Sequence, residues 1–234
     1  MIFRYDPEIG KKFPSLFTSL VLIRDLPENI DLTDQIAHLH GDALCRLAGG
    51  SESEILAIRA WRAAFSAMGL KPTQYRCASE ALLRRLRKDG DLPTLNPVVD
   101  ACNATSAALA VPVAAFDLDR IAGNLTVRYA TGAETYSTFG GSIEHPNPGE
   151  VVFADDAGVA HARRWTNRQS AASAVSPDTQ RVLVVIEGLH DEAEADVVAA
   201  RDTLSELFTE AGAVVRKGIL RSGVGHFQPE EEDI

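Results

Sequence analysis

The sequence predicts an α+β fold in which helices flank a β-sandwich or mixed-sheet core. Three observations predict it: helical spacing of apolar residues over much of the first hundred positions, short apolar runs separated by Gly, Asp and Pro after Val113, and a return to helical spacing from Asp191. The 234 residues are 45% hydrophobic, which is enough for a sizeable core. The expected organisation is a single domain over 1–234, with an N-terminal helical portion over 1–70, a core over 76–212 and an acidic tail over 227–234.

The first seventy residues predict one strand and two helices. Residues 17–23 form a short apolar run typical of a buried strand, and residues 31–47 have helical spacing that ends before Gly49 and Gly50. Ser51 and Glu54 have the spacing of a capping box, so we expect a second helix to begin there and to end at Gly69.

Two further helices are predicted before the β-rich part. Ser79 has the residue type of an N-cap, followed by leucines at helical spacing. Asn96 followed by Pro97 is a strong helix start, because proline suits the first helical position. That helix should run to about Leu109 and end before Pro112.

The second half predicts strands followed by a helix and a last strand. The run 182–186 is apolar throughout, as expected of a strand buried on both faces. A helix is expected over 191–211 and a strand over 213–220. The apolar run 182–186 lies within the longer expected strand RVLVVIEGL. The remaining expected strands are the runs VAAF, NLTVRYA, TYSTF, EVVFAD and VAHARRW.

Charge and motif content exclude several functional classes. The formal net charge of −10 argues against a protein that coats nucleic acid, and no DNA partner is expected. The histidines and cysteines lack metal-ligand spacing, and no P-loop, dinucleotide fingerprint or Gly-x-Ser-x-Gly elbow is present, so we expect no metal and no cofactor. No apolar run approaches the length of a membrane span, and we expect a cytoplasmic protein with reduced thiols.

Several motifs resemble the editing module of the phenylalanyl-tRNA synthetase β-subunit. LPTLNPVVDACNATSAALAVPVAAFD, at residues 92–117, is similar to a run in which Pro–Asn–Val–Val–Asp–x–x–Asn leads to Pro–x–x–Ala–Phe–Asp. The likeness continues through DLDRIAGNLTVRYATGAE, GEVVFADDAGVAHARRWTNRQS and SPDTQRVLVVIEG, and covers about two thirds of the chain. It implies a β-sandwich or mixed-sheet core flanked by helices, as in that module. We expect a free-standing relative that handles charged tRNA and does not make it.

Two residues are candidates for catalysis, Asn103 because of the resemblance and Glu187 because of its place in the sequence. Asn103 matches the family's asparagine beside the editing pocket, where its amide could donate to a carbonyl oxygen or hold the terminal adenosine. The alternative is a buried Asn satisfied by nearby backbone. Glu187 ends the apolar strand, and its carboxylate could bind a substrate ammonium group or orient water; the alternative is a strand-terminal Glu in solvent.

The run RRWTNRQS supplies candidate binding residues. Trp165 offers a stacking plane, while Arg164 or Arg168 could grip a phosphate or carboxylate. The alternative is a strand end whose Trp enters the core and whose Arg residues pair with the excess acid. The candidates for substrate binding are Trp165, Asn167, Arg168 and Gln169, and those for RNA binding are Arg84, Arg85, Arg163 and Arg164.

Two functions remain open from the sequence. The first is a tRNA-binding protein that takes the acceptor end and hydrolyses mischarged aminoacyl-tRNA in trans, with Asn103, Trp165 and Glu187 converging on one pocket. The second is a non-catalytic binding module for an amino acid, nucleotide or protein partner. The family's histidine is replaced by Ala114, and its discriminating glutamate aligns with Val185, so specificity for tyrosine is not implied.

Overall fold

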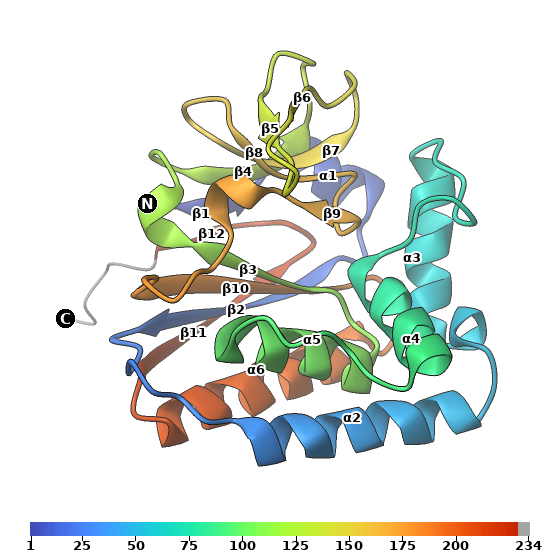
Figure 1. Cartoon of the computed structure of the whole chain (residues 1–234). Helices are drawn as coiled ribbons and strands as arrows, with labels where there is room; N and C mark the ends of the chain where they lie inside the picture. The colour runs from blue at the N-terminus through green and yellow to red at the C-terminus, as the bar shows by residue number, and fades with distance from the viewer. Residues whose placement is uncertain (229–234) are drawn as a thin grey trace.

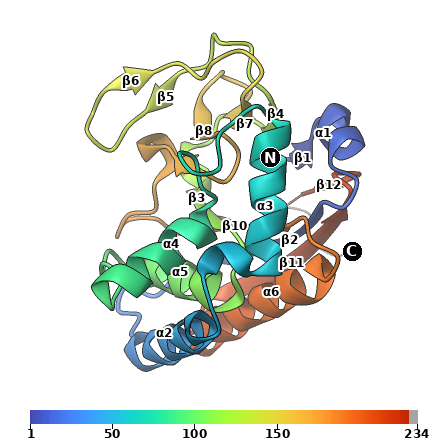
Figure 2. The same ribbon diagram turned by 90° about the vertical axis from the view of Figure 1, so that its right-hand side faces the viewer.

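The computed structural model describes residues 1–228 and shows two stacked β-sheets with helices on the outer face of one of them (Figure 1). The lower sheet in that view has the order β11-β2-β10-β3, and α5 and α6 cover its outer face, with α2 outside them. Helices α3 and α4 cover one end of the strand layers, as the turned view in Figure 2 also shows. The predicted α+β class, a mixed-sheet core flanked by helices, is confirmed.

The four-stranded sheet is antiparallel throughout and carries the most deeply buried strands. Its strands are β2 (Phe17–Arg24), β3 (Val113–Asp117), β10 (Arg181–Gly188) and β11 (Val214–Arg221). Alternate residues of β10 face opposite cores: Val182, Val184 and Ile186 pack toward the helices, whereas Leu183 and Val185 pack toward the other sheet. This double burial explains why the run is apolar throughout.

The six-stranded sheet joins the two ends of the described chain. Its order is β12-β1-β4-β7-β8-β9, and only the β1–β4 pair is parallel. A separate two-stranded ribbon pairs β5 with β6. The strands are β1 (Phe3–Tyr5), β4 (Leu125–Tyr129), β5 (Tyr136–Ser137), β6 (Ile143–Glu144), β7 (Val151–Asp155), β8 (Ala160–Arg163), β9 (Arg168–Gln169) and β12 (His226–Phe227).

The helix starts test the capping predictions. Asn96 caps α5 as predicted: its Oδ1 accepts the Val99 N–H at 3.0 Å, and Pro97 is the first helical residue. Ser51 does form a capping box, but it caps a short 3₁₀ turn, and α3 begins only at Leu56. The helices are α1 (Pro7–Lys12), α2 (Thr33–Ala48), α3 (Leu56–Ala67), α4 (Ala78–Asp89), α5 (Pro97–Leu109) and α6 (Ala193–Glu210).

One expectation about the elements is wrong. Ser79 does not cap α4; Cys77 occupies that position, and the Ala78 N–H bonds to the Thr166 carbonyl at 2.8 Å. The strand expected over 17–23 is present as β2, and β1 adds a further strand to the portion 1–70. Phe227, the first residue of the expected tail, lies buried in β12, and residues 229–234 of that tail lie outside the described residues.

Within residues 1–228, no helix is both long enough and apolar enough to cross a membrane.

Candidate functional site

A cavity of about 60 Å³ lies between the two sheets, where β3 forms the outer edge of its sheet. We call it the Glu187 cavity. It contains the predicted residues Trp165, Asn167, Arg168 and Gln169 together with Glu187. The full lining is formed by residues 112–114 and 165–169, with Ala78, Phe153, Ala162 and Glu187.

Among the described residues that line this cavity, Glu187 is the one with a carboxyl group. Its side chain is 1% exposed, and its Oε1 accepts hydrogen bonds from Trp165 Nε1 and from the Tyr5 hydroxyl, both at 2.7 Å. The Tyr5 hydroxyl is in turn 2.8 Å from the Thr18 hydroxyl. No described residue donates to Oε2, so one oxygen of the carboxyl group remains available to a ligand.

The surroundings of Glu187 change its acidity. Burial raises the pKa of Glu187 to about 7, although the hydrogen bonds from Trp165 and Tyr5 act in the opposite direction. Burial and the nearby Glu187 also raise the pKa of Tyr5 well above its usual value, so Tyr5 remains a donor. A carboxyl group that titrates near neutral pH can accept or release a proton under working conditions.

A strained turn holds the Trp165 indole over Glu187. Arg164 and Trp165 adopt left-handed backbone conformations, with φ of 50° and 57°, between β8 and β9. Such conformations are rare for bulky residues and persist only when the surroundings fix them. Here the Trp165 N–H bonds to the Val151 carbonyl at 2.7 Å, and the indole packs edge-on against Trp61 with ring centroids 5.0 Å apart.

The outer edge of β3 presents main-chain groups to the cavity. The Glu187 N–H donates to the Pro112 carbonyl at 3.2 Å, so this residue pair is a hydrogen-bonded one. Because hydrogen-bonded and non-hydrogen-bonded pairs alternate along antiparallel strands, the main-chain N–H and C=O groups of Val113 and Ala115 point away from β10. The Ala115 carbonyl accepts a hydrogen bond from Gln169 Nε2. The Val113 N–H has no acceptor among the described residues, and Val113 lines the cavity.

The other predicted binding residues are partly engaged within the protein. Asn167 Nδ2 donates to the Arg76 carbonyl at 2.7 Å, which anchors the β8–β9 turn to the segment before α4. The Arg168 side chain is 47% exposed and lies 3.4 Å from Glu144. Arg168 is therefore the lining residue that can reach solvent with its charge.

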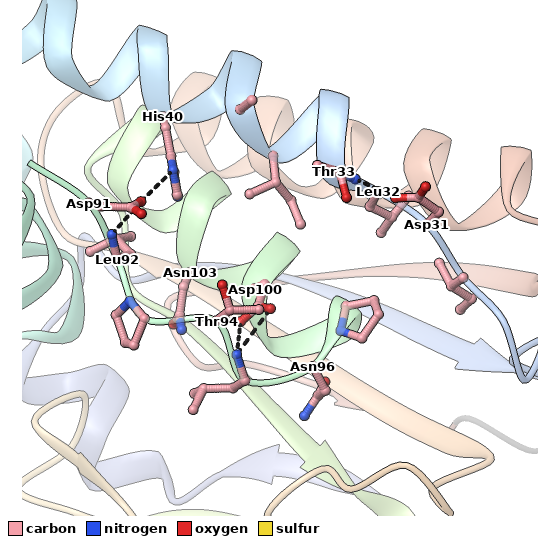
Figure 3. Close-up of a pocket in the computed structure, with 16 residues that line it drawn as sticks. Asp31, Leu32, Thr33, His40, Asp91, Leu92, Thr94, Asn96, Asp100 and Asn103 are labelled. Carbon is pink, nitrogen blue, oxygen red and sulfur yellow. Dashed lines mark hydrogen bonds and ion pairs between the residues drawn. The ribbon is translucent and has the colours of Figure 1, made fainter.

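The structure does not bring Asn103 to the Glu187 cavity. Asn103 lies in the middle of α5, whereas the cavity begins beyond the end of that helix, at Pro112. It lines instead a groove of about 380 Å³ between α2 and α5, the α2–α5 groove. Figure 3 shows Asn103 and Asp100 projecting from α5 toward the loop that carries Leu92 and Thr94. The expected convergence of Asn103 with Trp165 and Glu187 is therefore wrong.

The α2–α5 groove is acidic and partly apolar. Asp100 accepts the Leu95 N–H with both carboxylate oxygens, at 2.9 and 3.1 Å, and Asp91 lies 3.4 Å from His40 Nδ1. In the part of the chain that the structure describes, no three His, Cys, Asp or Glu side chains are grouped to hold a metal ion. The groove is lined by residues 30–33 and 91–97, with Ile36, Ala37, His40, Asp100 and Asn103.

The arginines predicted to bind RNA differ in how far their side chains are exposed. Arg163 is buried and bonds to Glu150 and Glu144, so it is a structural ion pair and is not free to contact RNA. Arg164 is 15% exposed and lies over the Tyr75 ring at 4.7 Å. Arg84 and Arg85 lie on α4 with half-exposed side chains, near Glu52 at 2.7 Å and Asp89 at 3.7 Å respectively.

Sequence reasoning missed Tyr5, Thr18 and the Val113 main chain. Tyr5 lies in a strand of three residues, too short for its alternation to be recognised. Thr18 and Ser19 are polar residues within a strand that the sequence predicts to be buried, and a buried polar residue needs a hydrogen-bond partner; this was the available signal.

Comparison with known proteins places these features in a family. The chain is 39% identical over 71 residues to the phenylalanine–tRNA ligase β-subunit of Yersinia pestis and 31% identical over 132 residues to that of Tropheryma whipplei. These segments cover 30% and 56% of this chain, but only 9% and 13% of the relatives, so the chain corresponds to a small part of their length.

The fold has a counterpart among solved structures. A crystal structure of an N-terminal fragment of the phenylalanyl-tRNA synthetase β-subunit from Pyrococcus horikoshii matches 92% of this chain and 50% of that chain, with a TM-score of 0.50 and 12% identity. The resemblance on which the sequence analysis depended is confirmed by these matches. Residues 60–223 match the family model described as the B3/4 domain, and the chain therefore belongs to the B3/4 domain family.

Proposed function

We propose that this protein binds the acceptor end of tRNA and hydrolyses mischarged aminoacyl-tRNA in trans. The observation that carries the proposal is the Glu187 cavity, which is lined both by a buried carboxyl group with one free oxygen and by Val113, whose main-chain N–H has no acceptor among the described residues. The names of the relatives, phenylalanine–tRNA ligase β-subunits, support tRNA as the partner.

The chemistry needs few groups. An aminoacyl ester is already activated, so hydrolysis requires a placed water, a donor for the developing oxyanion and a pocket for the amino acid. In this proposal the Val113 N–H donates to the oxyanion at the mouth of the cavity, and Glu187 holds the amino acid inside it. No covalent nucleophile takes part: the water adds to the ester carbon, the bond from that carbon to the ribose oxygen breaks, and the proton lost by the water goes to the ribose oxygen, which leaves as a hydroxyl group.

Helix α4 offers a route for the RNA. Its first residue, Ala78, lines the cavity, and Arg85 and Lys88 follow about 10 and 15 Å farther along the axis at roughly 1.5 Å per residue. Their side chains are 54% and 84% exposed. Phosphates of the acceptor stem would contact this basic end of α4 while the charged terminus enters the cavity. The net charge of −10 keeps such binding modest and sensitive to salt.

The test is a deacylation screen with tRNAs that each carry a different amino acid. We expect at least one ester to be hydrolysed above its spontaneous rate, and Glu187→Gln to slow that turnover at least tenfold. Glu206→Gln, an exposed change on α6, is the matched control and should have no effect. If no ester is hydrolysed faster than in buffer, the hydrolase proposal fails.

The alternative function, a non-catalytic binding module, is favoured by a different observation. The α2–α5 groove has a volume of about 380 Å³, within the range of small-molecule sites, roughly 300–1,000 Å³. Its carboxylates Asp31, Asp91 and Asp100 oppose phosphate, so an amino acid suits it better than a nucleotide. Binding of a free amino acid without turnover of any ester would support this alternative.

A further inference from the structure

The Glu187 cavity is small for a ligand site. A cavity needs roughly 10–15 Å³ to hold one water molecule, so the cavity of about 60 Å³ has room for only a few atoms of that size. The side chains of serine and threonine fit this number, whereas the ring of phenylalanine or tyrosine exceeds it.

The walls have little freedom to expand. Phe153 and Trp165 are 1% and 0% exposed, and the Trp165 indole is wedged against Trp61 and against Phe13, with ring centroids 5.0 and 4.9 Å apart. Its left-handed backbone leaves few other positions for the indole. Ala162 is buried in the same core cluster. These buried walls therefore set a steric limit on the part of the occupant that lies against them.

The polar chemistry of the cavity selects among small occupants. Its innermost walls are aromatic or methyl groups, and Glu187 Oε2 is the acceptor that its neighbours leave unused. An apolar side chain would bury this oxygen without a partner, which costs free energy. A hydroxyl group would satisfy it, and a site built to bond a hydroxyl discriminates strongly against the isostere that lacks it.

We propose that the substrates are tRNAs charged with a small, hydroxyl-bearing amino acid of the size of serine or threonine. The side chain enters the Glu187 cavity, and its hydroxyl group donates to Glu187 Oε2. This inference rests on the proposed deacylase function, and it assigns Glu187 to recognition of the side chain rather than to activation of water.

Threonine and valine provide the decisive pair of esters, because their side chains have nearly the same shape and differ in the hydroxyl group. With the full-length protein, we expect threonyl-tRNA to be hydrolysed at least a hundredfold faster than valyl-tRNA, and tyrosyl- and phenylalanyl-tRNA to remain at the spontaneous rate. Glu187→Gln should reduce the threonine preference below about tenfold, because it slows threonyl hydrolysis more than valyl hydrolysis. An equal loss for every ester would instead identify Glu187 as a base for water and overturn the inference.

Filling the cavity tests the size limit. Ala114→Leu adds a branched side chain to a lining residue and should abolish threonyl turnover, whereas Ala133→Leu, at an exposed position, is the matched control. Circular dichroism and melting temperature show whether each variant is folded.

A second readout does not depend on catalysis or on those variants. Adenosine carrying the amino acid through a non-hydrolysable 3′-amide can be titrated by calorimetry, and the threonyl amide should bind more tightly than the valyl or tyrosyl amide. Threonyl preference in binding without hydrolysis of any ester would retain the recognition site and remove the hydrolase. Turnover of tyrosyl-tRNA as fast as threonyl-tRNA would retain the hydrolase and overturn the inference.

Discussion

The Glu187 cavity and the α2–α5 groove differ in volume and in what their carboxyl groups do. The groove is the larger, about 380 against 60 Å³. Its Asp100 uses both oxygens on the Leu95 N–H, and the Asp91 side chain is 77% exposed beside His40. In the cavity, one oxygen of Glu187 is held by two donors and the other is left for a ligand.

The difference shows that volume alone does not mark a chemical site. In the groove, Asp100 accepts the Leu95 N–H of the neighbouring loop, Asp31 accepts the Thr33 N–H at the start of α2, and Asp91 is exposed to solvent. These carboxylates therefore need no ligand. Glu187 has been removed from water without full compensation, which is the usual condition of groups that act on substrates. Four predictions test whether the two regions differ in this way.

The largest expected effect is on stability. Trp165→Ala should lower the free energy of unfolding by roughly 3–5 kcal/mol, because it removes a fully buried indole and a donor to Glu187. Leu95→Ala in the groove, where the side chain is 64% exposed, should change it by less than about 0.5 kcal/mol. Urea unfolding measures both. Similar losses for the two variants would mean that the groove is packed as tightly as the cavity.

The second effect is a pH dependence. The pKa of Glu187 is raised to about 7 from a usual 4.5, so between these values the folded protein binds more protons than the unfolded chain. The resulting stabilisation is present at low pH and is lost as the pH rises through about 7. Relative to Glu187→Gln, the wild type should lose roughly 3 kcal/mol over this interval, since one pKa unit corresponds to about 1.4 kcal/mol.

Groups that titrate in both proteins cancel in that difference. Burial also raises the pKa of Asp100, but this carboxylate is less buried and fully bonded, so Asp100→Asn should show a change of the same sign and smaller size. Unfolding curves at pH 5 and pH 8 suffice. A wild-type difference that does not depend on pH would mean that Glu187 is ionised normally.

The third effect is on turnover. Glu187→Gln should slow hydrolysis of the preferred ester by roughly tenfold to a hundredfold, corresponding to about 1.4–2.7 kcal/mol in the barrier. Asn103→Ala should change it less than about threefold, because Asn103 lines the groove. Single-turnover deacylation measures both rates. If the Asn103 variant is as slow as the Glu187 variant, the two regions work as one site.

The smallest effect is on tRNA affinity. Arg85→Glu and Lys88→Glu on α4 should each weaken binding by roughly tenfold at moderate salt and reduce its salt dependence. Arg24→Glu is the control, because it lies at the opposite end of β2 from Thr18, about 20 Å away at roughly 3.3 Å per residue. Filter binding at several salt concentrations gives the result. Equal weakening by the control would indicate a non-specific charge effect.

Local features of the fold were predictable, whereas the partners of Glu187 were not. Asn96 and Pro97 predicted the start of α5 because capping depends on neighbours within three residues. Tyr5 reaches Glu187 across 182 positions, and no local spacing encodes that contact. The turn at Arg164 was missed because left-handed backbone usually requires Gly or Asn.

The candidate site was predicted only in part for the same reason. Helical spacing assigns Asn103 to a face of α5, but it does not say which neighbour that face meets. Composition likewise counts Arg163 as a basic residue, although its buried charge is already paired with Glu150 and Glu144. The choice between an ion pair and a free cation depends on tertiary packing.

The position of β1 has a consequence for how this chain folds. Phe3 pairs with Phe227 on one side and with Leu125 on the other, so both partners of β1 lie more than a hundred positions away in the sequence. Such distant pairing slows folding and leaves β-edges exposed in the meantime. A fragment cut at the family boundary, residues 60–223, would lose β1 and the central strand β2, and with them Tyr5 and Thr18. The hydrogen-bonded surroundings of Glu187 therefore depend on two strands that lie outside the segment defining the family.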